Sequence, residues 1–350
     1  MKSSLLVLSL FSSYLFANNN IVPTAELVES VIPAKIIERR NPIYPVSAAR
    51  NGNEGWVQLS FVVDENGRVV DPVVEDSSGI VSFEKASLRA MKGWKYEPAK
   101  RNGKTIEQCR NTIQMDFMLD QSTKGGRRRF VNEYKAARQA LESGDLPLTE
   151  QLITEMENGK IWNRYEDAWF WMLKAEFAKT QGDEGAQLAS LKRGVNSNES
   201  ESHLGTDMFI YLLQQKFILE VRASLFVDAL STFERISQRP DSEKMVAQLE
   251  GYASKVRQYL TDEDYILVKG QIDIDGDWWH SLSRNRFSFT NISGNLDSVE
   301  LRCANKREKY TFAADTQWNI PESWGRCKVM VVGENQANFN LVEIRQDLKV

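Results

Sequence analysis

The sequence EGWVQLSFVVDENG, residues 54–67, decides the fold of the first part of the chain. From Trp56 to Val63 apolar side chains stand among polar ones, a pattern that predicts a strand with a buried face. An Asn-Gly step at 66–67 ends this run. Because both residues tolerate a positive φ, the step predicts a β-hairpin whose second strand covers residues 68–76.

Two further elements follow the hairpin. Ser77-Ser78-Gly79 ends the second strand, and residues 83–92 have the spacing of a short helix with one apolar face. After a turn at Asn102-Gly103, apolar and polar side chains alternate from Ile113 to Leu119. This alternation predicts one long strand with a single apolar face, and together the elements predict an α+β domain.

The order and spacing of these pieces resemble the TonB C-terminal domain family. The resemblance covers roughly a quarter of the chain, and we place the domain at residues 34–122. The motifs that carry it are Pro42-Ile43-Tyr44-Pro45, Glu54-Gly55-Trp56-Val57, Phe61-Val62-Val63-Asp64 with Gly67, Ser77-Ser78-Gly79, Phe83, Ala86, Leu88, Ala90, Trp94-Lys95-Tyr96-Glu97-Pro98 and Asn102-Gly103-Lys104.

The resemblance implies a peptide-binding function. In this family the domain binds a short extended segment of an outer-membrane receptor or another envelope protein. The implied mode is β-strand addition to the C-terminal strand, residues 112–119, with affinity from main-chain hydrogen bonds. The family also places the segment before Tyr44-Pro45 against the partner; here that segment is Arg40-Asn41-Pro42, where a glutamine is common. The candidate partner-binding residues are Asn41, Tyr44, Thr112, Gln114, Asp116 and Met118.

The chain also departs from the family. An energy transducer has an inner-membrane helix and a long proline-rich spacer before this domain, whereas residues 18–41 contain only two prolines, Pro23 and Pro33. The family domain usually ends its chain, but here residues 123–350 follow it. We therefore expect a periplasmic accessory of TonB-dependent transmembrane transport. The alternative is a periplasmic scaffold for cell-envelope assembly that reuses the domain as a peptide-binding module.

Residues 1–17 predict a signal peptide. Lys2 supplies a positive start, residues 5–16 form an apolar, serine-containing run, and Ala17 suits a cleavage site. The alternative is an uncleaved membrane anchor. A helix of that run would reach only about 18 Å, against a hydrocarbon core of roughly 30 Å. The prediction is therefore export to the periplasm.

Residues 130–262 predict an all-α domain. Phe130, Tyr134, Ala137 and Leu141 recur at helical spacing, and the first helical run ends at Gly144-Asp145. A second helix ends at Gly182-Asp183. The interval between the two Gly-Asp steps resembles the repeat length of tetratricopeptide-type helical hairpins, although the full repeat signature is absent.

Two segments of this region have competing interpretations. The basic run at 124–129 is expected to be a solvated linker rather than a nucleic-acid site. An aromatic cluster is expected to be core between helices, with a peptide-binding groove as the alternative. Its members are Trp162, Tyr165, Trp169, Phe170 and Trp171.

Residues 263–350 predict a small all-β, sandwich-like domain. Here apolar residues recur at every second position, as at Ile266, Val268, Ile272 and Ile274. Turn residues separate these short alternating segments. The fold class is therefore multidomain: α+β, then helical repeats, then all-β.

The three cysteines have different expected states. In an exported chain Cys303 and Cys327 are expected to form a disulfide, which would stabilise the domain by roughly 3 kcal/mol; two buried thiols are the alternative. Cys109 has the same strand parity as Ile113, so it is expected to be a buried free thiol.

The composition gives no support for catalysis. The chain has two histidines, His203 and His280, and neither has a second histidine or a cysteine at helical spacing. Residues 273–277 resemble a calcium loop superficially, but Arg284 occupies the twelfth position, where the loop needs a glutamate. No nucleotide-binding or nucleophile motif appears. We expect no enzymatic activity, no cofactor and no metal, and the net charge of −4 argues against a nucleic-acid partner.

We expect the mature chain to begin near Asn18, to hold one disulfide between Cys303 and Cys327, and to keep Cys109 reduced. Intact-mass analysis of the exported protein, with and without alkylation, measures the start and the redox state. Two alkylatable thiols at positions 303 and 327 contradict this prediction.

Overall fold

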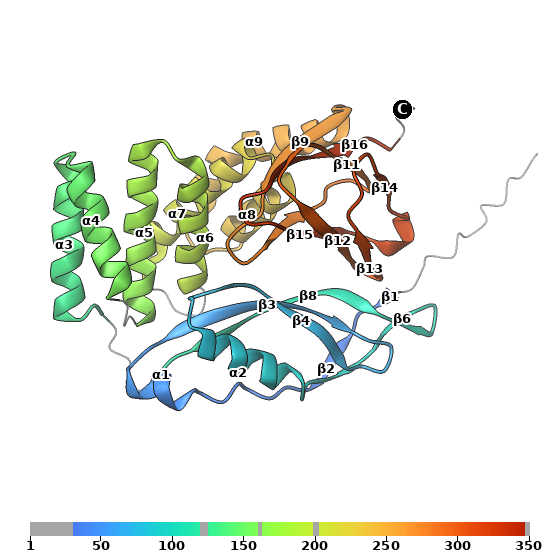
Figure 1. Cartoon of the computed structure of the whole chain (residues 1–350), viewed down its shortest axis with the longest axis horizontal. Coiled ribbons are helices and arrows are strands. Elements are labelled where there is room, and N and C mark those ends of the chain that lie inside the picture. Colours follow the sequence, from blue (N-terminus) through green and yellow to red (C-terminus); the bar gives the residue numbers. More distant parts are fainter. Residues whose placement is uncertain (1–30, 120–124, 160–162, 199–202, 347–350) are drawn as a thin grey trace, which may run out of the picture.

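The structure, a computed structural model, describes residues 31–119, 125–159, 163–198 and 203–346. The expected signal peptide and Trp162 lie outside these residues. Figure 1 shows the α+β domain lying along one side of the molecule, next to both the helices and the C-terminal β-rich part.

The α+β domain is built on a three-stranded antiparallel sheet. Strand β3 (Gly55–Val63) is central, between β4 (Val69–Ser77) and β8 (Gln108–Phe117). Helix α2 (Val81–Met91) covers one face, where Phe83 joins Leu59 and Met115 in a buried core. The remaining elements are α1 (Val46–Arg50), β1 (Val31–Ile32) with β6 (Ala99–Arg101) and β7 (Lys104–Ile106), and β2 (Lys35–Glu38) with β5 (Lys95–Glu97).

The hairpin between β3 and β4 forms where the sequence predicts it. Gly67 has a positive φ, of 76°, and Asn66 does not. Asp64 explains the difference, because its carboxylate accepts the backbone N–H groups of Asn66 and Arg68 at 2.9 and 2.7 Å. These two hydrogen bonds hold the turn at Asn66, and Gly67 supplies its left-handed residue.

The helices follow one another as antiparallel neighbours. Both Gly-Asp steps have the same geometry: the glycine has a positive φ (78° at Gly144, 73° at Gly182), and the aspartate caps the next helix. This pairing satisfies backbone groups at two helix ends with two residues. The helices are α3 (Arg128–Glu142), α4 (Leu146–Asn158), α5 (Arg164–Gln181), α6 (Glu184–Ser197), α7 (Thr206–Arg222), α8 (Phe226–Ser237) and α9 (Glu243–Asp262).

The C-terminal part has two four-stranded antiparallel sheets that share one apolar core. Cys303 and Cys327 face each other in register on neighbouring strands and form a disulfide. The expectation for Ile274 is wrong: it lies in a turn and is 86% exposed. The strands are β9 (Tyr265–Gln271), β10 (Asp277–Ser281), β11 (Arg286–Ser293), β12 (Leu296–Cys303), β13 (Arg307–Thr311), β14 (Gln317–Asn319), β15 (Cys327–Gly333) and β16 (Asn338–Ile344), with a short 3-10 helix, η1 (Glu322–Trp324).

The basic run before α3 has exposed arginines at a helix start, as its composition predicts: Arg127 to Arg129 are exposed, and α3 begins at Arg128. Arg127 is in addition held by the start of α5. The N–H and guanidinium of Arg127 both bond to the buried carboxylate of Glu166. The carbonyl of Gly125 accepts a hydrogen bond from the Asn163 side chain at 3.1 Å. These contacts fasten the start of α3 to the start of α5.

Within the parts of the chain that the structure describes, no helix has the length and apolar character needed to cross a membrane.

Two glycine substitutions are expected to change stability in opposite directions. Gly182 has a φ of +73°, so Gly182→Ala should lower the free energy of unfolding by about 1 kcal/mol. Gly251 lies inside α9 with open space around its Cβ position, so Gly251→Ala should raise it by about 0.5–1 kcal/mol. Urea unfolding followed by circular dichroism measures both; changes of the same sign contradict the assignment.

Candidate functional site: the edge strand of the α+β domain

The two edges of the central sheet differ in their fitness for pairing. On β4, Asp71 has a positive φ of 46°, Pro72 lacks an N–H, and the register with β3 shifts twice. Such features block the addition of another strand. Strand β8 contains neither proline nor glycine, and its register with β3 shifts only once, near its start.

The outer edge of β8 is almost free of backbone partners. Within the described residues, the only backbone hydrogen bond from β8 to another domain runs from Cys109 N–H to Ala304 C=O, at 3.2 Å. Cys109 itself is free and buried, and burial raises the pKa of its thiol to about 12. Beyond this contact the edge from Asn111 to Phe117 has the form of a pairing site.

The rest of the chain covers the sheet face opposite α2. The indole N–H of the fully buried Trp56 donates to Ser197 Oγ on α6, at 3.0 Å. On the neighbouring strand β4, Glu75 forms an ion pair of 2.7 Å with Lys328 on β15. The sheet is therefore enclosed on both faces, and the β8 edge is its remaining opening.

A buried arginine joins the sheet to the helices. Arg164, 1% exposed, starts α5; its guanidinium bonds to Asp116 on β8 and to the carbonyl of Gly55 on β3. The same guanidinium donates to the carbonyls of Asn196 and Ser197 at the end of α6, at 3.0 and 2.9 Å. Its positive charge thus lies between a carboxylate and the negative end of a helix.

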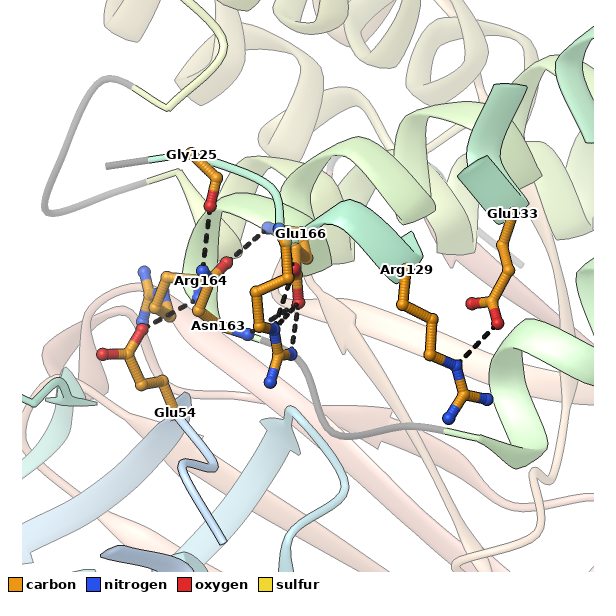
Figure 2. Close-up of polar contacts among 8 residues, drawn as sticks. Glu54, Gly125, Arg129, Glu133, Asn163, Arg164 and Glu166 are labelled. Atoms are coloured by element: carbon orange, nitrogen blue, oxygen red, sulfur yellow. Dashed lines mark hydrogen bonds and ion pairs between the residues drawn. The ribbon is translucent and has the colours of Figure 1, made fainter. Parts of the chain in front are cut away.

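The surrounding polar groups extend this junction. Figure 2 shows Glu54 reaching Arg164, and Asn163 and Glu166 gathered at the start of α5. Glu54 accepts the Arg164 N–H at 3.1 Å and the Leu119 N–H at 2.9 Å, so it holds the residue that follows β8. Asn163 and Glu166 form a capping box.

The structure separates the four predicted residues of the β8 region into two pairs. Thr112 and Met118 are exposed to solvent. Gln114 and Asp116 turn toward the helices, where Gln114 Nε2 donates to Asn196 O at 2.9 Å and Asp116 bonds to Arg164. The second pair is therefore held by the chain itself.

The two predicted residues before α1 also differ. Asn41 is exposed. Tyr44 packs edge-on against Phe83 and Phe117 and donates its hydroxyl proton to Asn53 O. Burial, with a smaller contribution from Glu54, raises the pKa of Tyr44 above its usual range. Tyr44 therefore organises the core, whereas Asn41 is open to contact.

The sequence-based reasoning did not identify Arg164, Ser197 or Glu54 as functional positions. Their partners lie far away in sequence, and no local pattern marks Arg164 or Ser197; Glu54 belongs to the motif at residues 54–57, which gives it no stated role. Among the described residues, no group of three or more metal-ligating side chains is assembled.

Comparisons with known proteins identify the α+β domain. Residues 40–119 match the family model of the Gram-negative bacterial TonB protein C-terminal. Protein tonB2 of Pseudomonas aeruginosa is 37% identical over 79 residues, 23% of this chain and 29% of that protein. Protein TonB of the same organism is 32% identical over 96 residues, 27% of each chain. The solution NMR structure of the Pseudomonas aeruginosa TonB CTD matches with 25% identity and a TM-score of 0.22, covering 26% of this chain and 90% of that chain.

These matches have a limited extent. The chain spans 29% and 27% of the lengths of the two curated relatives. The family model ends at residue 119, before the helical and β-rich parts. The TonB-like character deduced from the motifs is confirmed for residues 40–119.

Arg164→Met should destabilise the protein by about 3 kcal/mol, because it leaves Asp116 and two helix-end carbonyls without their buried partner. The matched control is Arg129→Met, which removes an exposed pair with Glu133 and should cost less than about 0.5 kcal/mol. Denaturant unfolding followed by tryptophan fluorescence measures both. Equal effects of the two substitutions would show that the junction is not stabilising.

Proposed function

We propose, taking residues 40–119 as a TonB-like C-terminal domain, that the protein binds an extended segment of an envelope protein by strand addition to β8. In this proposal it is a non-enzymatic accessory of TonB-dependent transmembrane transport, and the partner segment belongs to an outer-membrane receptor. Main-chain hydrogen bonds to the β8 edge supply most of the affinity.

The contrast between the two sheet edges carries this proposal. Pro72 and the left-handed Asp71 make β4 unsuitable for pairing, whereas β8 presents a regular run from Asn111 to Phe117. A natural sheet usually protects its edges. Strand β4 has such protection and β8 lacks it. This contrast supports a pairing role for β8.

The enclosed sheet restricts how a partner approaches. With α2 on one face and the α5–α6 junction on the other, a segment reaches the sheet only along β8. Thr112 and Met118 are exposed at this edge and supply side-chain contacts. Gln114 and Asp116 contribute indirectly, by holding the strand against Asn196 and Arg164.

The disulfide between Cys303 and Cys327 supports an oxidising compartment such as the periplasm. We therefore propose export by residues 1–17. We also propose that the helices form tetratricopeptide-like hairpins and that the last part is a β-sandwich.

A scaffold for cell-envelope assembly is the alternative function. The observation that favours it is the polar junction at Arg164, which fixes the TonB-like domain to the helices rather than leaving it free. A domain held in one position suits an adaptor that presents several surfaces in a constant arrangement.

A photo-crosslinking residue at Thr112 should form a covalent adduct with a TonB-dependent outer-membrane receptor in intact cells. The control position is Lys309, exposed on the edge strand β13 of the C-terminal part, where no such adduct is expected. Synthetic peptides of the crosslinked segment, N-methylated one residue at a time, then separate the binding modes. Strand addition predicts that methylation at alternate residues abolishes binding to the full chain.

Each other outcome has a defined meaning. Adducts with cell-envelope assembly proteins, formed from Thr112 and not from Lys309, support the scaffold and overturn the transport role. Peptides that tolerate N-methylation at every residue overturn strand addition and indicate side-chain recognition. Absence of any adduct specific to Thr112 overturns the β8 edge as the binding site.

A further inference from the structure

The outer face of the TonB-like domain is strongly basic. Figure 1 shows α1, α2 and β2 on this face, with the helices α3 to α9 and the β-rich part on the other side of the sheet. Residues 35–50 and 81–97, which include these elements, carry eight basic and three acidic side chains, a net charge of +5. All eight basic side chains are exposed, in a chain whose net charge is −4. This concentration of positive charge attracts an anionic partner.

The exposed side of α2 supplies the centre of this charge. Because the buried residues of α2 face the sheet, the opposite side of the helix points outward. Lys85, Arg89 and, at the C-cap, Lys92 are exposed there, spaced by four and three residues. The one carboxylate of the helix, Glu84, is half-buried and accepts a hydrogen bond from Ser77 Oγ at 2.6 Å. None of the three basic residues forms an ion pair with a residue that the structure describes.

Two arginines that follow β2 extend this charge at the end of α2. The side chain of Arg40 packs against Gly93, and its carbonyl accepts the indole N–H of Trp94 at 2.8 Å. The guanidinium of Arg39 lies over the ring of Trp94, 5.1 Å from its centroid. Both arginines are exposed, so their charges add to those of α2 on one continuous surface.

Carboxylates offset only part of the charge. Glu38 pairs with Arg40 at 2.7 Å and with Lys95 at 2.9 Å. The turn at residues 64–68 meets Lys95 from its other side and adds two acidic residues and one arginine. With this turn included, the net charge of the face is still +4.

Large aliphatic side chains protrude from the same part of the domain. Ile43 is 87% exposed and adjoins Tyr44, which packs against Phe83 near the start of α2. A side chain that stands out this far lines no groove. The others with more than half of their surface exposed are Ile37, Val46 and Val81.

We propose that this face binds the surface of a phospholipid bilayer that contains anionic lipids. The basic side chains would contact the headgroups, and Ile43 with its aliphatic neighbours would enter the interface. Single aliphatic side chains that protrude among cations suit a fluid lipid surface, whereas a protein partner needs a contiguous apolar patch or a pocket. The surface is separate from the β8 edge and does not depend on strand addition there.

The test is co-sedimentation of the full chain with phosphatidylcholine vesicles, prepared with and without phosphatidylglycerol, at low and at high salt. We expect binding only to the vesicles that contain phosphatidylglycerol, and weaker binding at high salt. Lys85→Gln combined with Lys92→Gln should lower the partition coefficient at least about tenfold. The matched control, Lys244→Gln combined with Lys255→Gln, removes two exposed charges from α9 and should leave it unchanged.

A second pair of variants tests the aliphatic contribution. Ile43→Ser should weaken vesicle binding, whereas Ile274→Ser, at a residue that is 86% exposed in the β-rich part, should not. All of these positions are exposed, so the melting temperatures should stay the same.

The contrary outcomes are distinct. Binding to neither kind of vesicle overturns the proposal and makes an acidic protein the partner of this face. Equal binding to both kinds of vesicle, or equal losses in the two lysine variants, overturns the role of the basic face. Equal binding by Ile43→Ser and Ile274→Ser overturns the entry of aliphatic side chains into the interface.

Discussion

The guanidinium of Arg164 is the contact on which the arrangement of the molecule depends. Burying a charged arginine is costly unless its donors and its charge are satisfied, and here the partners come from β3, β8 and the end of α6. Those partners belong to two domains, so the guanidinium is satisfied only when the TonB-like sheet lies against the helices. Trp56 and Ser197 extend the same contact, and Ser197 in turn bonds to Asp167 on α5.

The C-terminal part completes the enclosure of the sheet. Arg302 on β12 reaches Ser60 Oγ at 3.3 Å, and Lys328 pairs with Glu75, so the C-terminal part covers the middle of the outer face. A sheet covered on two faces interacts with other chains only through its edges. Because Pro72 and Asp71 close one edge, β8 is left as the place where an extended segment can add. In the proposed function, the enclosure limits partner binding to one strand and one direction of approach.

Local chemistry made part of this structure predictable from sequence. The period-two strands, the Asn66-Gly67 hairpin and the TonB-like motifs depend on neighbouring residues, and the structure contains the corresponding elements. The junction was not predictable, because Arg164 meets Asp116 and Gly55 across long sequence separations and resembles any other surface arginine in the chain. For the same reason the contacts of Gln114 with Asn196 and of Asp116 with Arg164 were not foreseen. Ile274 was misassigned because an apolar residue in a tight turn keeps the period of the strand before it.

The central claim is that the chain encloses the TonB-like sheet and leaves the β8 edge open. Amide hydrogen exchange in the full-length protein, resolved by residue, tests it most directly. The account predicts slow exchange at every amide from Trp56 to Ser60 on β3. From Asn111 to Phe117 on β8, it predicts slow and fast exchange at alternate residues, because every second amide points away from β3. Uniformly slow exchange along β8 would show that another part of the chain covers the edge, and would contradict the account.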